Sequence, residues 1–392
     1  MLIALASAFS LSQAFRTVTA MMARQLQTDF SLTARQLGVF AGTFHFTFGA
    51  MQLLMGIGID LHGVRRTILA AFPVAVAGAL LSALAQEFWL VVAGQALIGV
   101  GCAPAFLVCT VFIARKFPVA RFASVSGLVM GIGGVGMLLT ATPLAWVVEH
   151  SSWRTGFLIL AAASALAWLA VYFFVDEEAT KPNPNGESVA QAVKQFGALI
   201  AMPHTWGIVA LGAVSYASFI TLRGLWLGPL LIERYGFSLV ASGNVALVVS
   251  IVSLFGPPLF GRFDPKSARR QWIVGFTVAM AALFCALAFV HVAALAVAIA
   301  LVVSFLTGYI VLQYADVRLA YPEALTGRAM AVFTMAMFLG IALMQWLTGV
   351  AATAASARGI DPFEAVMLTT ATMLALGAIA FRVLPRPAGR DA

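Results

Sequence analysis

Long apolar runs, separated by short polar segments, follow one another along almost the whole chain. Each run is close to the roughly 20 apolar residues that a helix needs to cross a bilayer, and charged or turn-forming residues bound it. We therefore expect twelve membrane-spanning helices, near residues 2–23, 36–59, 67–86, 88–113, 122–147, 154–175, 203–233, 239–262, 271–291, 293–317, 326–352 and 361–384. The first run begins at Met1 without a basic segment and shows no clear cleavage site, so we expect it to be a retained span.

The composition agrees with this pattern. Of the 392 residues, 62% are hydrophobic and 10% are charged, whereas a soluble domain has about 45–50% apolar and about 25% charged residues. This excludes a cytosolic enzyme, a secreted scaffold and a disordered protein. Twelve spans with short loops also leave no room for a sizeable soluble domain.

The distribution of basic residues predicts the orientation of the spans. Sixteen of the 23 Lys and Arg lie in the tail and in the segments on one side, and five lie on the other side. Because basic residues concentrate on the cytoplasmic side, we expect both termini to be cytoplasmic. The net charge of +8 therefore reports topology, and it does not indicate a nucleic-acid partner.

One long polar stretch divides the chain. It begins at Asp176 and contains KPNPNG, whose Pro, Asn and Gly do not continue a helix. We expect the following organisation: an N-terminal six-helix bundle at 1–175, a cytoplasmic linker at 176–202, a C-terminal six-helix bundle at 203–385 and a short cytoplasmic tail at 386–392.

The two halves carry matching residues at nearly one offset. Four pairs recur 207 or 204 positions apart: Arg16 and Arg223, Arg121 and Arg328, Asp60 and Asp264, Pro118 and Pro322. Such agreement indicates duplication of a six-helix unit, a common construction in secondary transporters. The predicted fold is an all-α membrane protein with two pseudo-symmetric bundles. The substrate would bind near the midplane, where the repeats face each other.

Several segments carry a resemblance to a known family. They are GIGIDLHGVRR at 56–66, its degraded copy GRFDPKSARR at 261–270, GQALIGVGCAPAF at 94–106, GLVMGIGGVGM at 127–137 and WRTGF at 153–157. With them the chain resembles the major facilitator superfamily. The resemblance implies two six-helix bundles around a central cavity, alternating access and a monomer. Leu61 stands where that family usually has a basic residue, and Gln95 stands where many proton-coupled members have an arginine, which argues against drug/proton antiport of that type.

Two arginines, Arg16 and Arg223, fall inside apolar spans, a few residues past the middle. Each costs about 2.5–3.5 kcal/mol on insertion scales, so such residues are functional by default. Two guanidinium groups facing one cavity would clamp a carboxylate or phosphate. The pair resembles the organic anion and organophosphate branch of the superfamily, which has one such arginine on helix 1 and one on helix 7. The alternative is that each arginine snorkels or pairs with an internal carboxylate, but no acid lies near mid-membrane.

Proton coupling commonly uses a buried carboxylate. All fifteen acids fall in loops or near span ends, and Asp316 is the deepest. His45 lies inside its span. Because an imidazole can take up a proton near neutral pH, it would either carry a proton, hydrogen-bond the substrate while neutral, or bond a neighbouring helix. Whether His45 or Asp316 titrates during transport stays open.

Other intramembrane residues complete the candidate binding site. We select Gln52, Tyr309, Gln313, Tyr216 and Trp226. For the two glutamines the alternative is an interhelical hydrogen bond, and for the aromatic residues it is packing. Beyond Arg223, two glycines and a proline weaken the helix, which would let it bend as a gate.

The candidate gating residues lie at the cytoplasmic rim. By resemblance, ion-pair latches would form among Asp60, Arg65, Arg66, Asp264, Arg269 and Arg270. The alternative is simple positive-inside anchoring.

The chain shows no sign of catalytic or cofactor chemistry. Its three cysteines lie in apolar runs without paired spacing, so we expect neither a disulfide nor a metal site. The sequence contains no cofactor motif and no nucleophile pair, so we do not expect an enzyme. The leading hypothesis is a transporter of a small organic anion in a bacterial inner membrane, moving with a proton or cation or against a counter-anion. The alternatives are efflux of a lipophilic compound or metabolite and a transporter-derived sensor or binding protein.

Overall fold

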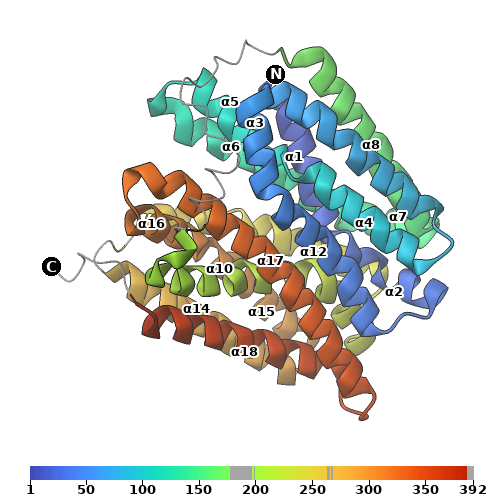
Figure 1. The fold of residues 1–392 in the computed structure, drawn as a ribbon. Coiled ribbons are helices and arrows are strands. Elements are labelled where there is room, and N and C mark those ends of the chain that lie inside the picture. The colour runs from blue at the N-terminus through green and yellow to red at the C-terminus, as the bar shows by residue number, and fades with distance from the viewer. Residues whose placement is uncertain (177–196, 198, 263–264, 266–267, 386–392) are drawn as a thin grey trace. The chain divides into compact units, whose positions relative to one another are not determined.

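Helices make up all the regular structure in the part of the chain that can be described (Figure 1). The computed structural model describes residues 1–176, 197, 199–262, 265 and 268–385. Within them, eleven helical segments are long and apolar enough to cross a membrane. The first expected span is present as the helix pair α1 (Leu2–Thr17) and α2 (Thr19–Phe30), each of which alone is shorter than a span. The predicted all-α membrane class is confirmed.

The remaining helices of the first half are mostly interrupted. The helix α3 (Ala34–Leu84) contains two spans joined at Gly63, whose φ of 85° breaks the helix. One span is formed by α4 (Phe88–Cys102) with α5 (Ala105–Lys116), the next by α6 (Val119–Leu139) with α7 (Thr142–His150), and the last by α8 (Trp153–Phe174).

In the second half, several spans are likewise built from interrupted helices. Its first span runs through α10 (Pro203–Thr221), the π-helical turn η1 (Leu222–Trp226), α11 (Leu227–Pro229) and a second π-helical turn, η2 (Leu230–Arg234). The others are α12 (Leu239–Ser253) with α13 (Gly256–Arg262), α14 (Arg269–Phe289), α15 (Ala293–Leu306) with η4 (Thr307–Tyr309) and α16 (Ile310–Ala320), α17 (Glu323–Ser356), and α18 (Pro362–Val383).

The contacts between residues divide the chain into two compact units. Unit 1 comprises Met1–Pro184 and Arg223–Ser250, and unit 2 comprises Asn185–Leu222 and Ile251–Ala392. In unit 1 the helices α3 and α4 run side by side, and in unit 2 α17 lies along α10 and α18 (Figure 1). The segment Arg223–Ser250 therefore packs with the N-terminal helices. The predicted linker 176–202 lies largely outside the described residues, the tail 386–392 lies entirely outside them, and the division into six-helix bundles stays a prediction.

The helix α1 is the central element of unit 1. Every residue from Ala8 to Thr17 is buried, whereas a helix at the edge of a bundle exposes one face. Close backbone approach makes this possible, because a Cβ at Gly136 of α6 would collide with the carbonyl oxygen of Ser10. A polar side chain on α1 is therefore held inside protein and away from lipid.

Exposed tryptophans lie near the ends of several spans. Trp89, Trp146, Trp206 and Trp272 are each more than half exposed, in α4, α7, α10 and α14 respectively. Indole rings concentrate at the two membrane–water interfaces because they are apolar with one polar edge. Their positions fit helices that end at those interfaces.

Candidate functional site

Arg16 lies in the last turn of α1 and is 6% exposed. Its guanidinium carbon is 4.7 Å from the centre of the Phe48 ring, which belongs to α3. The face of an aromatic ring attracts a cation, and more strongly where water is excluded. The side chain of Arg16 is thus directed at the first span of α3.

Arg223 lies in the π-helical turn η1 and is completely buried. Its Nε donates a hydrogen bond to Ser250 Oγ of α12, and its Nη2 donates to the carbonyl oxygen of Met137 in α6, both at 2.9 Å. Both acceptors are neutral. Within the described residues, no carboxylate compensates the charge of this guanidinium group.

The Met137 carbonyl is available because α6 ends there. In an uninterrupted helix it would accept a bond from the amide of Ala141. That amide instead bonds the Leu138 carbonyl, and the backbone at Ala141 has φ −101° and ψ −119°. Pro143 follows within the first turn of α7 and lacks an N–H. The last carbonyls of a helix need outside donors, and Arg223 is one such donor.

The backbones that carry the two arginines lie against each other. A Cβ at Gly224 would be 2.9 Å from the carbonyl oxygen of Arg16, and one at Gly228 would collide with the carbonyl oxygen of Ala20. Only glycine permits this approach without displacing a helix. The side chains of Arg16 and Arg223 therefore project from backbone segments that lie next to each other, and both residues belong to unit 1. The predicted weakness of the helix after Arg223 is visible in its two π-helical turns.

Three further sequence candidates lie in unit 1. His45 is buried, and its Nδ1 lies 3.1 Å from the carbonyl oxygen of Ala41. Gln52 is buried and donates from Nε2 to the carbonyl oxygens of Phe48 and Ala103, so it makes the interhelical hydrogen bond that was its alternative role. Trp226 is buried in η1.

The remaining binding candidates lie in unit 2. The hydroxyl of Tyr309 lies 2.9 Å from Thr277 Oγ1, and Gln313 Nε2 donates to Ser215 Oγ at 2.8 Å. Both of these candidates are buried and connect helices of their own unit. Tyr216 is half-buried, with its ring 6.4 Å from that of Phe219.

The candidate latch residues are only partly described. Asp264 and the side chain of Asp60 lie outside the described residues. Arg65 Nη2 donates to the carbonyl oxygen of Tyr172, in the last turn of α8. Arg66 is exposed and Arg269 is buried.

Arg270 makes an ion pair inside unit 2. Its Nε and Nη2 donate to the carboxylate of Asp316 at 3.0–3.2 Å, and its guanidinium carbon lies 4.7 Å from the Phe381 ring centre. In the described part of the chain, Asp316 is the one acidic side chain that is buried, at 3% exposure. This pair connects α14 to α16. The acidic partner of Arg270 is therefore Asp316 in α16, whereas the acids expected for the latches were Asp60 and Asp264.

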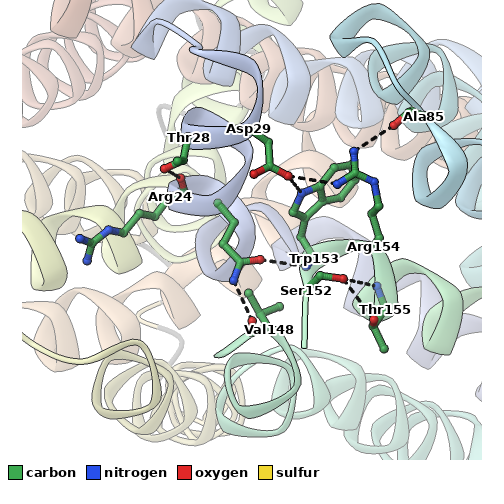
Figure 2. Close-up of polar contacts among 10 residues, drawn as sticks. Arg24, Thr28, Asp29, Ala85, Val148, Ser152, Trp153, Arg154 and Thr155 are labelled. Atoms are coloured by element: carbon green, nitrogen blue, oxygen red, sulfur yellow. Dashed lines mark hydrogen bonds and ion pairs between the residues drawn. The ribbon is translucent and has the colours of Figure 1, made fainter. Parts of the chain in front are cut away.

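The WRTGF segment is part of a polar cluster at one end of unit 1 (Figure 2). The carboxylate of Asp29 accepts hydrogen bonds from Trp153 Nε1 at 2.7 Å and Arg154 Nη1 at 3.0 Å. Arg154 also donates to the carbonyl oxygen of Ala85, just after α3. Gln25 accepts from the Trp153 amide and donates to the Val148 carbonyl. The cluster connects α2 to α7 and to the start of α8, so the segment has a structural role.

The spans define a membrane protein with many membrane-spanning helices. The chain matches the family model of the Major Facilitator Superfamily over residues 4–343 and belongs to that family. It is a transporter and not an enzyme.

Individual relatives are distant. A probable sulfoacetate transporter of Cupriavidus necator, SauU, is 24% identical over 172 residues, which cover 44% of this chain and 39% of the relative. A hexuronate transporter of Bacillus subtilis is 22% identical over 253 residues, covering 62% and 58%. In both cases the match spans less than two thirds of the relative's length. The crystal structure of a D-xylose-proton symporter has a TM-score of 0.80 at 16% identity and covers 99% of this chain and 98% of that chain, which shows the shared fold.

Sequence reasoning missed the partners of the charged residues. Ser250 is one of many serines in apolar runs, and no spacing distinguishes it. For the Met137 carbonyl the sequence did contain an indication: Pro143, six residues later, interrupts an apolar run and so predicts a helix break nearby. For Asp316, the signal was its depth as the innermost acid.

We expect that removing either partner of the Arg270–Asp316 pair destabilises the protein. Arg270→Gln should lower the free energy of unfolding by about 3 kcal/mol, because it takes a charged partner from the buried carboxylate of Asp316. Asp316→Asn should lower it by less, because the side chain of Arg270 is 23% exposed. Thermal unfolding in detergent measures this. The double variant should lose less than the sum of the two single losses, while Arg318→Gln, at an exposed position of the same helix, should unfold like the wild type. A wild-type unfolding midpoint in Asp316→Asn would contradict the expectation.

Proposed function

We propose that this protein is a secondary active transporter of a small organic anion, a carboxylate or a phosphate ester, bound by Arg16 and Arg223 during alternating access. One observation carries the proposal. The buried guanidinium group of Arg223 contacts only neutral oxygens among the described residues, and an uncompensated charge in a low-dielectric environment is costly. An anionic substrate would supply the missing negative charge.

The neighbourhood of Arg16 supports the same proposal. Its guanidinium lies over an aromatic ring, and its backbone lies against that of Gly224. Two planar forks on adjacent helices match the two oxygens of a carboxylate or the oxygens of a phosphate. Two of the similar proteins are described as transporters of sulfoacetate and of hexuronate, and both compounds are organic anions.

Several further properties belong to the proposal. The transporter is a monomer in a bacterial inner membrane with both termini on the cytoplasmic side, as the distribution of Lys and Arg favours. A site with two positive charges disfavours unassisted return when empty, so transport is either exchange against a counter-anion or symport with a proton or another cation. The other predicted contributors stay predictions: His45, Gln52, Tyr216, Trp226, Tyr309 and Gln313.

Uptake into proteoliposomes tests the proposal. Sulfoacetate and D-glucuronate are the labelled probes, measured as counterflow and under an imposed pH gradient. We expect Arg16→Gln and Arg223→Gln to lower kcat/KM about a hundredfold, because each loses charged hydrogen bonds of about 1.5–3 kcal/mol apiece. The lysine variants should retain part of the activity, since they keep the charge but lose the fork.

The control for this assay is Arg358→Gln, which removes an exposed arginine and should transport like the wild type. Full uptake by Arg16→Gln and Arg223→Gln would refute the anion clamp. Transport of a lipophilic cation that is unaffected by both variants would favour efflux of lipophilic compounds instead.

A further inference from the structure

The donors of Arg223 are used unevenly. A guanidinium group has five N–H donors in a planar fork. The Nε donor is held by Ser250, one Nη2 donor is held by the Met137 carbonyl, and the buried Nη1 has no hydrogen-bond partner within the described residues. The edge formed by Nη1 and Nη2 therefore carries the unused hydrogen-bonding capacity of the group.

Ser250 is oriented to hold the Nε donor of Arg223. Its own hydroxyl proton is directed to the Ala246 carbonyl, to which Oγ donates at 2.7 Å. The oxygen lone pairs then accept from Arg223 Nε at 2.9 Å. Ser250 is fully buried, so water does not compete for this bond. The serine fixes the plane of the guanidinium group and so the direction of Nη1 and Nη2.

The Met137 carbonyl is the exchangeable partner. It is a neutral acceptor at the end of α6, whereas hydrogen bonds from arginine to an oxyanion are roughly twice as strong as neutral ones. An oxyanion against Nη1 and Nη2 would accept two parallel bonds from Arg223, whereas the carbonyl accepts one. The carbonyl, at the break between α6 and α7, would then lose its bond from Arg223 and keep the bond from Thr140 Oγ1.

We propose that Arg223 exchanges partners on binding: Ser250 keeps the Nε donor, and an oxyanion of the substrate binds Nη1 and Nη2 in place of the Met137 carbonyl. This inference rests on the proposed function, and it adds a positioning residue and a response of α6 to substrate. Ser250 acts through Arg223 and does not itself touch the substrate.

The positioning role is tested with Ser250→Ala against Ser242→Ala. Both serines are buried in α12, and both donate to the carbonyl four residues earlier, but Ser250 also accepts from Arg223. In the uptake assay with sulfoacetate and D-glucuronate, we expect Ser250→Ala to raise KM about tenfold with little change in kcat. Ser250→Thr should rescue most of the loss, and Ser242→Ala should keep the wild-type KM.

The outcomes separate this inference from the proposed function. If Arg223→Gln abolishes uptake while Ser250→Ala keeps the wild-type KM, the positioning role is wrong and the anion clamp stands. In the Arg223→Gln background, Ser250→Ala should have no further effect on residual uptake, and an undiminished effect would also overturn the positioning role. If the wild type transports neither anion, the proposed function fails and this inference fails with it.

The exchange of partners is tested by hydrogen exchange of the backbone. Bound ligands usually slow amide exchange, but here we expect sulfoacetate or D-glucuronate to speed the exchange of the peptide covering residues 136–142 several-fold, because α6 loses its donor from Arg223. Arg223→Gln should exchange fast without ligand and should not respond to it. Slower or unchanged exchange in this peptide, with a transported anion present at saturation, would overturn the exchange.

Discussion

A buried positive charge in the membrane interior is the constraint on which the architecture of unit 1 depends. Arg223 is fully enclosed, and the hydrocarbon core offers no water to solvate it. Its charge is tolerated because η1 turns it towards a serine of α12 and a carbonyl of α6. The glycines at 224 and 228 bring this segment against α1 and α2. Arg16 is consequently enclosed by protein on the neighbouring helix.

The ends of broken helices supply much of the polar environment. Carbonyls near helix ends lack partners of their own, and in several places a side chain from another helix donates to them. Gln52 donates to Ala103 between α4 and α5, Arg65 to Tyr172 at the end of α8, and Arg154 to Ala85 after α3. The bond from Arg223 to Met137 belongs to the same group. It differs because its donor carries a buried charge that no carboxylate among the described residues compensates, and the proposed anion site rests on that difference.

The existence and type of the helices could be predicted from the sequence, because apolar runs of span length have few other stable forms in a bilayer. The residues at which the helices begin and end were less predictable. The expected span 326–352 became α17, Glu323–Ser356, since helices continue into polar turns beyond the hydrocarbon region. The breaks at Val18 and between α6 and α7 depend on contacts between helices, such as the 2.6 Å hydroxyl pair of Thr17 and Thr140. The buried arginines could be identified by their cost in the membrane, but their partners could not, because Pro143 signals a break near Met137 without indicating which side chain donates to the carbonyl there.

The anion site at Arg16 and Arg223 is tested most directly by the thermal unfolding of the purified protein with sulfoacetate or D-glucuronate. An anion at 100 times its dissociation constant should stabilise the wild type by about 2.7 kcal/mol, with the same gain in Arg358→Gln and none in Arg16→Gln or Arg223→Gln. Equal stabilisation in the two buried-arginine variants, or stabilisation of the wild type by a lipophilic cation and by neither anion, would contradict an anion site built on these residues.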